Sequence, residues 1–153
     1  MVKDRVTVIS GAGGGLGRVV TKRFADAGAQ LALLGRSTDK LEALKDELDL
    51  DKERTLAKAA DLSDLESTKG AAAAVIENFG QIDILINLVG GWIGGKAILE
   101  TEEKDIDSML QQHVKASYVM IKSFVPPMLE QGWGRVLAVS SPSAARPPGN
   151  NAP

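Results

Sequence analysis

The stretch with the clearest capacity for chemistry is a glycine-rich run between Ser10 and Gly17. Because glycine has no Cβ, such a run allows positive φ angles and lets a phosphate approach the backbone closely. An apolar run of strand length, Val6–Ile9, precedes it and a helical pattern follows, so free helix N–H groups face the turn. The pattern predicts a pyrophosphate-binding turn; the alternative is a glycine turn without a ligand. The residues expected to border the ligand are Ser10, Gly11, Gly13, Gly15, Leu16 and Gly17.

The spacing of these glycines selects among the known nucleotide-binding turns. A Walker loop ends in Gly-Lys-Ser/Thr, whereas Gly17 is followed by Arg18. The dinucleotide pattern Gly-x-Gly-x-x-Gly also fails, because its last glycine would fall on Leu16 or on Arg18. The spacing that remains is Gly-x-x-x-Gly-x-Gly, from Gly11 to Gly17, with a serine in front.

Short apolar runs and helical patterns alternate along the chain, and these elements must position the turn. Their order predicts an α/β, Rossmann-like, doubly wound parallel sheet with the strand order 3-2-1-4-5. In such sheets, ligands bind beyond the carboxyl ends of the strands. The expected strands are Val6–Ile9, Leu31–Leu34, Thr55–Ala60, Ile82–Ile86 and Arg135–Ser140.

The helices carry signals of their own. Ser37 or Thr38 can cap the second helix, and Ser63 the third. A long helix is expected from about Glu102 to Leu129, with two prolines that should kink or break its end. The residues expected to face inward are Leu16, Val19, Val20, Phe24 and Ala27 in the first helix, and Ile106, Met109, His113, Met120, Ile121 and Phe124 in the long one.

Composition sets the broad limits. The chain has 153 residues, 44% of them hydrophobic and 25% charged, which fits a single domain spanning residues 1–153. A net charge of −2 and scattered basic residues give no reason to expect nucleic acid or a membrane as partner. The absence of cysteine and the presence of one histidine make a metal site unexpected. With no apolar run of bilayer length and no visible signal peptide, we expect a cytoplasmic protein.

Motifs at successive strand ends resemble one family. Ser10 and the glycine spacing are similar to the Thr-Gly-x-x-x-Gly-x-Gly turn of short-chain dehydrogenases/reductases. Asp61 and Leu62 resemble the Asp-Leu/Val pair that contacts adenine in that family, although the aspartate could simply cap a helix. The segment Asn87-Leu-Val-Gly90 resembles the Asn-Asn-Ala-Gly motif, from which its two middle residues depart. The resemblance implies cofactor contacts from Asp61, Leu62, Asn87, Val89 and Gly90.

Two further residues gain a role from the resemblance. The last expected strand and Ser141 resemble the strand that carries the family's catalytic serine, although a plain turn serine is the alternative. His113 stands where many members have an asparagine that holds a water in a proton relay. Histidine can also hold a water or shuttle protons, and the alternative is a histidine satisfied within the core.

Charge beyond the second strand indicates the cofactor. Enzymes that prefer NAD usually place a carboxylate there to bind the ribose 2′-hydroxyl. This chain has Gly35 followed by Arg36 and Ser37, and a guanidinium can bind a 2′-phosphate with two parallel hydrogen bonds. We therefore expect NADP(H) rather than NAD(H). The alternative is an exposed arginine on a loop.

The family's Tyr-x-x-x-Lys pair is missing from its usual place, which lies just beyond Pro153. Tyr118 and Lys122 have the right spacing but precede Ser141, so we do not expect them to be catalytic. The chain is expected to be incomplete at its C-terminus, truncated before a sixth strand, with an exposed apolar fifth strand.

Two functions stay open. One is an oxidoreductase similar to 3-oxoacyl reductases, which would act on a small-molecule carbonyl or alcohol and form homo-oligomers. Its activity would need the missing Tyr-x-x-x-Lys pair. The other is a non-catalytic nucleotide-binding or interaction module.

Overall fold

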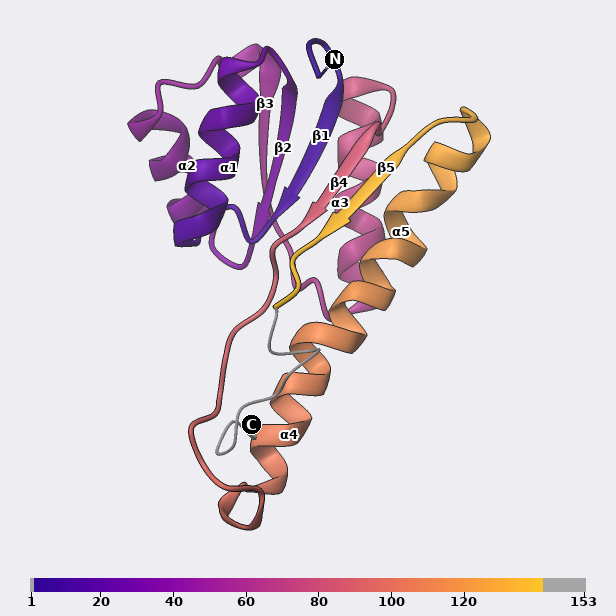
Figure 1. The fold of residues 1–153 in the computed structure, drawn as a ribbon. Helices are drawn as coiled ribbons and strands as arrows, with labels where there is room; N and C mark the ends of the chain where they lie inside the picture. The colour runs from indigo at the N-terminus through magenta and orange to yellow at the C-terminus, as the bar shows by residue number, and fades with distance from the viewer. Residues whose placement is uncertain (1, 142–153) are drawn as a thin grey trace.

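The computed structural model describes residues 2–141, which form one five-stranded sheet flanked by helices (Figure 1). The sheet has the order β3-β2-β1-β4-β5, and every neighbouring pair is parallel. This confirms the predicted fold. Most of the expected tail, residues 142–153, lies outside the described residues. The strands are β1 (Val6–Ser10), β2 (Gln30–Gly35), β3 (Thr55–Ala59), β4 (Ile84–Asn87) and β5 (Arg135–Ala138).

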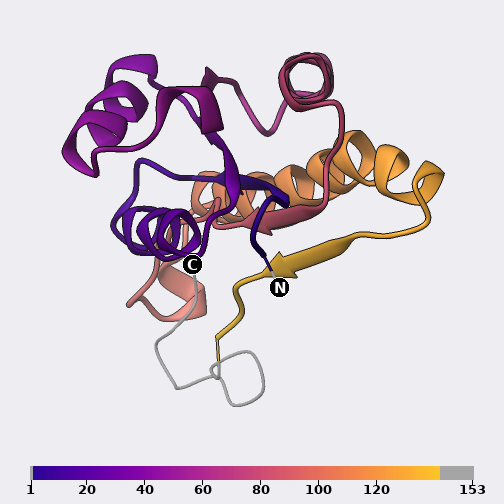
Figure 2. The same ribbon diagram turned by 90° about the horizontal axis from the view of Figure 1, so that it is seen from above.

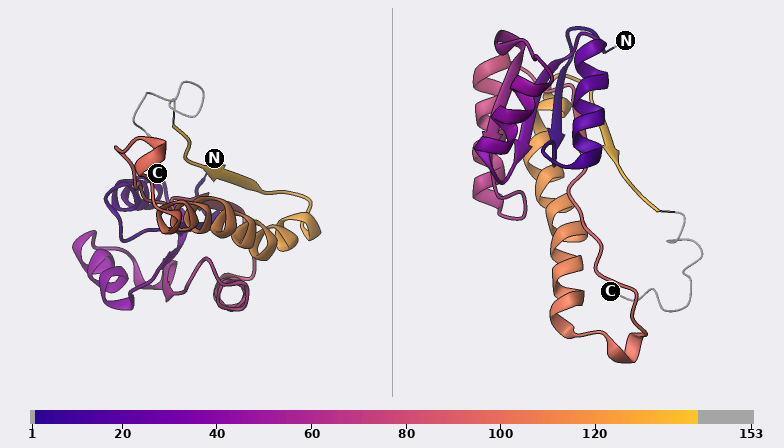
Figure 3. Two further views of the ribbon diagram at one scale, coloured as in Figure 1. Left: turned by 90° about the horizontal axis from the view of Figure 1, so that it is seen from below. Right: turned by 90° about the vertical axis from the view of Figure 1, so that its left-hand side faces the viewer.

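The helices form one layer on each face of the sheet (Figure 2). Helices α1 (Gly15–Asp26) and α2 (Thr38–Glu47) cover one face, and α3 (Leu65–Phe79) and α5 (Ala116–Glu130) cover the other. Helix α4 (Glu103–Met109) and a π-helical segment (residues 110–115) lead into α5. Together they form one long helical run that extends beyond the carboxyl ends of the strands (Figure 3). Two single 3₁₀ turns are Lys52–Arg54 and Ile98–Glu100.

The core consists of two apolar clusters separated by the sheet. Neighbouring strand residues alternate between them: Val8 packs with Met120 and Phe124, whereas Ile9 packs with Leu41 on the opposite side. Strands buried on both faces explain why β1, β2 and β4 read as nearly continuous apolar runs.

Helix α1 buries only part of the face expected to point inward: Val20 and Phe24 pack against the core, whereas Leu16, Val19 and Ala27 are exposed. Leu16 and Val19 are 53% and 64% exposed, whereas Gly17 and Thr21 are buried. The reason is the close approach of the helix to the glycine turn, where a Cβ on Gly17 would lie 2.3 Å from the Gly11 carbonyl oxygen. Only glycine can pack so tightly at this point, and the neighbouring Leu16 and Val19 side chains point outward.

The predicted cap of α3 was one residue off. Asp64, not Ser63, is the N-cap, and its carboxylate accepts from the Ser67 N–H at 2.8 Å. The Ser63 hydroxyl is instead committed to Asp61, at 2.7 Å. The cap of α2 is Ser37, one of the two residues expected there.

Of the two expected effects of the prolines, a kink or a break, the break does not occur: Pro126 and Pro127 lie inside α5, which continues to Glu130. A proline inside a helix costs about 3 kcal/mol. Phe124 and Met128 are buried on either side of the pair, and their packing holds the helix together across it. Three residues expected to face inward, Ile106, His113 and Ile121, are exposed, whereas Met120 and Phe124 are buried as expected.

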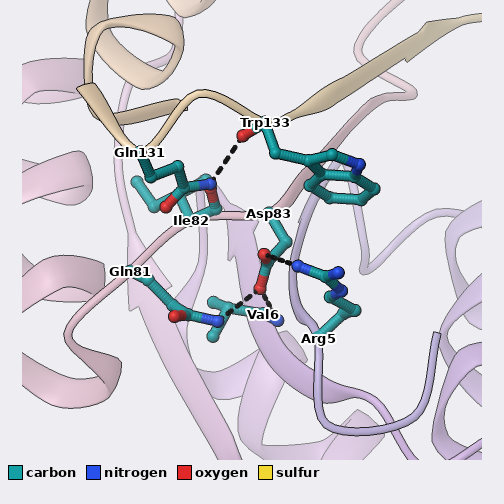
Figure 4. A network of polar contacts seen from close by, with 7 residues as sticks. All are labelled: Arg5, Val6, Gln81, Ile82, Asp83, Gln131 and Trp133. Carbon is teal, nitrogen blue, oxygen red and sulfur yellow. Dashed lines mark hydrogen bonds and ion pairs between the residues drawn. The ribbon is translucent and has the colours of Figure 1, made fainter. Parts of the chain in front are cut away.

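A buried carboxylate ties together the amino ends of three strands (Figure 4). Asp83 is 2% exposed in its side chain and accepts from the Arg5 guanidinium at 2.7 Å, the Val6 N–H at 2.8 Å and the Gln81 amide at 2.7 Å. The Arg5 guanidinium also stacks 4.1 Å above the ring of Trp133, just before β5. Gln131 donates to the carbonyls of Ile82 and Trp133, both at 2.7 Å. The network therefore joins β1, β4 and the approach to β5.

We predict that Asp83→Ala destabilises the fold by about 1–3 kcal/mol, because it leaves the buried Val6 N–H and the half-exposed Arg5 guanidinium without their acceptor. Urea unfolding followed by circular dichroism measures the change. Asp26→Ala is the matched control: its carboxylate forms an exposed pair with Lys22, and the expected loss is under about 1 kcal/mol. Equal losses for the two variants would contradict a structural role for the Asp83 network.

Candidate functional site

The carboxyl ends of the strands bring most of the predicted site residues to one edge of the sheet. The register pairs Ser10 with Leu34 on one side and with Asn87 on the other. Asn87 in turn pairs with Ala138, three residues before Ser141. The loops that follow β1, β2, β3 and β4 therefore open at the same edge, beside the long helical run (Figure 3). This arrangement groups the glycine turn with Arg36, Asp61 and the loop after Asn87.

The backbone of the loop after β4 packs against the glycine turn at Gly11, whereas the turn is open at Gly15. Gly11 has φ of +67°, and a Cβ there would lie 3.1 Å from the Leu88 carbonyl oxygen, so glycine is required. Nothing lies within 4 Å of a Cβ built on Gly15. Gly14 caps α1 without any side-chain hydrogen bond, so the first helical N–H groups face the open side. These groups suit an anion such as a pyrophosphate.

Ser10 and Asn87 hold the turn from inside. The Ser10 hydroxyl donates to the Asn87 side-chain oxygen at 3.0 Å and accepts from the Leu88 N–H at 3.1 Å. That side-chain oxygen also accepts from the Val89 N–H at 3.0 Å, and the Asn87 amide donates to Ser117 at 2.9 Å. Asn87 is 8% exposed, and its side chain is committed to these partners. It positions the loop, whereas the half-buried Val89 and the exposed Gly90 form the loop surface.

His113 lies in the π-helical segment and bonds to the same loop. Its Nε2 lies 2.8 Å from the Gly91 carbonyl oxygen. A carbonyl can only accept, so Nε2 carries the proton in this contact. A Cβ on Gly90 would lie 2.7 Å from the His113 ring, so a larger residue there would displace the imidazole. The ring is exposed rather than satisfied within the core. A proton-relay role for His113 stays a prediction.

Asp61 and Leu62 play different parts at the end of β3. Asp61 is exposed, and its carboxylate accepts from the Ser63 hydroxyl at 2.7 Å and the Ser63 N–H at 2.9 Å. These two hydrogen bonds, aided by the positive charges of Lys115 and Arg36, lower the pKa of Asp61 below its ordinary value. Leu62 is buried in the core, so its side chain belongs to the packing of α3.

Arg36 and Ser37 stand between β2 and α2. The Arg36 side chain is exposed, and among residues 2–141 no ion pair holds it. The Ser37 hydroxyl accepts the Lys40 N–H at 3.4 Å as the cap of α2. No carboxylate occupies the end of β2, where one would repel a 2′-phosphate.

Ser141 is exposed just after β5, as expected for a residue at the open edge. Tyr118 and Lys122 lie on α5, with the ammonium 5.8 Å from the ring centre. Tyr118 lines an open hollow of about 540 Å³ together with residues of the long helical run alone, and Ser141 is not among them. The structure therefore gives no support to this pair as a partner of Ser141.

Two residues near the site were missed by sequence reasoning. Ser117 joins Asn87 to His113. Its hydroxyl accepts from the Asn87 amide and donates to the His113 carbonyl at 2.6 Å. Lys115 contributes positive charge near Asp61. The spacing of four residues between His113 and Ser117 was the available signal, since residues so spaced lie on one helical face.

The short chain dehydrogenase family model matches residues 5–153, nearly the whole chain. The chain belongs to the short-chain dehydrogenase family. Among relatives, it is 36% identical over 139 residues to the 1,6-dihydroxycyclohexa-2,4-diene-1-carboxylate dehydrogenase of Pseudomonas putida, covering 91% of this chain and 51% of that protein. It is 34% identical to dehydrogenase/reductase SDR family member 7B of Bos taurus, covering 92% of this chain and 45% of that one.

Solved structures give the same family. A metagenomic short-chain oxidoreductase in complex with NADP matches with a TM-score of 0.88 at 25% identity, covering 99% of this chain and 68% of that one. The 3-ketoacyl-(acyl-carrier-protein) reductase of Brucella melitensis complexed with NADH matches with a TM-score of 0.86 at 30% identity, covering 99% and 63%. The chain spans about half the length of the curated relatives it matches. Within residues 2–141, no helix has the length and apolar character needed to cross a bilayer.

We predict that Ser63→Ala raises the pKa of the Asp61 carboxyl toward its ordinary value, because the strongest hydrogen bond to the carboxylate is lost. A carbon-detected NMR titration of the side-chain carboxyl measures it. Ser67→Ala is the matched control: its hydroxyl accepts from the Asp61 N–H rather than bonding the carboxylate. A pKa unchanged in Ser63→Ala would show that the Ser63 N–H and nearby positive charge, not this hydroxyl, control the carboxyl group.

Proposed function

We propose that this chain is the cofactor-binding part of an NADP(H)-dependent short-chain dehydrogenase/reductase that reduces a carbonyl or oxidises a secondary alcohol. The observation that carries the proposal is the glycine turn beside the uncapped N-terminus of α1, with an unpaired arginine where NAD-preferring enzymes place a carboxylate. A cytoplasmic location and a homo-oligomeric state remain predictions.

Each part of the site fits one part of a nicotinamide cofactor. The α1 N-terminus and the glycine turn after β1 suit the pyrophosphate. The loop that follows Asn87 leaves β4, the strand paired with β1. Asp61 and Arg36 border the adenosine side, and Arg36 would hold the 2′-phosphate. The similar metagenomic structure contains NADP and the Brucella one contains NADH, which supports a nicotinamide cofactor. The preference for NADP(H) rests on the charge at the end of β2.

The bound cofactor would supply or accept the hydride. Reduction leaves negative charge on the substrate oxygen, which needs a hydrogen-bond donor and a proton in place. Ser141 would donate a hydrogen bond to that oxygen and orient the carbonyl. A hydroxyl is too weak an acid to donate the proton alone at neutral pH, and the Tyr-x-x-x-Lys pair that would do so belongs, on our proposal, to a following part of a longer protein. The substrate would be a small carbonyl or alcohol, with 3-oxoacyl thioesters as the first class to test.

A second function is favoured by one feature, the open edge of the sheet. All four residues of β5 are exposed, with Val136 and Leu137 each 46% exposed. An exposed apolar edge strand readily pairs with another chain. A non-catalytic nucleotide-binding or interaction module would use this edge.

We predict that Arg36→Ala weakens NADP⁺ binding by about 10- to 100-fold, because a charge-assisted phosphate contact contributes about 1.5–3 kcal/mol. NAD⁺ has no 2′-phosphate and should lose little. Isothermal titration calorimetry with both nucleotides measures the effect. Arg23→Ala, an exposed arginine in the last turn of α1, is the control and should change neither affinity. Equal weakening for both nucleotides, or none, would refute the assignment of Arg36.

We predict that residues 1–153 alone do not oxidise NADPH with 3-oxoacyl thioesters or simple ketones, whereas the full-length gene product does. Losing a positioned general acid typically lowers a rate by about 10²–10⁴-fold. Loss of NADPH absorbance compares the chain, the full-length product and its Ser141→Ala variant. Turnover by residues 1–153 would mean that another residue donates the proton. Full activity in Ser141→Ala would exclude Ser141 from the mechanism, and a gene product ending at Pro153 would favour the module.

A further inference from the structure

We propose that Lys40, in the first turn of α2, is a second specificity-determining residue that holds the 2′-phosphate of NADP(H) together with Arg36. The inference rests on the proposed function and extends it by a residue that no sequence motif identified. It starts from a contact between α2 and the glycine turn.

Lys40 borders the glycine turn directly. A Cβ built on Gly13 would lie 3.7 Å from the Lys40 Cβ, which is van der Waals distance. The lysine side chain therefore leaves α2 beside the turn, and Gly13 leaves space for it. Lys40, Gly13 and Arg36 are all exposed, so a ligand at the turn meets them without displacing core residues. A flexible four-carbon stem then carries the ammonium toward a phosphate placed near the start of α2.

The charge of Lys40 is uncommitted, unlike that of most basic residues around it. In the same two helices, Lys22 pairs with Asp26, Lys45 with Glu42, and Arg18 with Glu47. Among the nine ion pairs of residues 2–141, none includes Lys40 or Arg36. A lysine in the first turn of a helix also faces the positive end of the helix dipole, an unfavourable position that a bound anion would relieve.

Two cations fit the charge of the ligand. A phosphate monoester carries about −1.5 to −2 charges at pH 7. Two carboxylates oppose it here: Asp61, which attracts Arg36 through space, and Asp39, next to Lys40 in the first turn. Arg36 and Lys115 both place positive charge near Asp61, and a dianionic phosphate beside Asp39 calls for a further cation. Lys40 supplies that charge from the first turn of α2, next to Asp39 and beside the glycine turn.

The experiment measures NADP⁺ and NAD⁺ affinities of the chain by calorimetry for Lys40→Gln, Lys40→Arg and Arg36→Ala. Lys45→Gln is the matched control, because it removes a lysine from the same helix that is already paired with Glu42. Thermal unfolding verifies that each variant folds. We expect Lys40→Gln to weaken NADP⁺ binding by about three- to ten-fold with NAD⁺ unchanged, and Lys40→Arg to retain the preference.

The outcomes separate this inference from the function on which it rests. If Arg36→Ala lowers the preference for NADP⁺ and Lys40→Gln behaves like Lys45→Gln, Lys40 is an ordinary surface lysine and the inference is wrong while the proposed function stands. If Lys40→Gln weakens NAD⁺ as much as NADP⁺, the lysine acts on the pyrophosphate, and its role in specificity is also wrong. If the unmodified chain binds neither nucleotide, the proposed function fails and this inference fails with it.

Discussion

The site depends most on the hydrogen bonds between Ser10 and Asn87, which join the ends of β1 and β4. The hydroxyl and the amide are buried, so each must find partners, and they find them in each other and in the N–H groups of Leu88 and Val89. As a result, the glycine turn and the loop after β4 are held as one rigid surface. Gly11 can then approach the Leu88 carbonyl so closely that no side chain fits between them.

The same linkage extends into the long helical run through Ser117, which accepts from Asn87 and donates to the His113 carbonyl. His113 returns to the loop by bonding Gly91. Its position in a π-helical segment is notable, because such segments occur frequently at functional sites. Three elements far apart in sequence thus share one polar network at the open edge of the sheet, and a change in any of them would shift the loop after β4.

The opposite edge of the sheet is fixed by a buried charge. Asp83 accepts from Arg5, Val6 and Gln81, and these donors offset the cost of removing a carboxylate from water. Since Arg5 also stacks on Trp133, the network sets where β5 begins and therefore where Ser141 emerges. The four residues of β5 are exposed, and the strand pairs with β4 alone among the described strands.

The sequence by itself determined the strand order, the glycine turn and the edge at which the polar residues gather. Alternating apolar runs and glycine spacing are local signals, and the right-handed crossover rule converts them into one topology. The tertiary structure decided what depends on contacts between distant segments. Gly17 packs against Gly11 and turns Leu16 and Val19 outward, and burial of Phe124 and Met128 carries α5 through its prolines. The commitment of Asn87 to internal partners and the approach of Lys40 to Gly13 arise in the same way. A helical pattern specifies which residues share a face, but only the packed neighbours decide which face is buried.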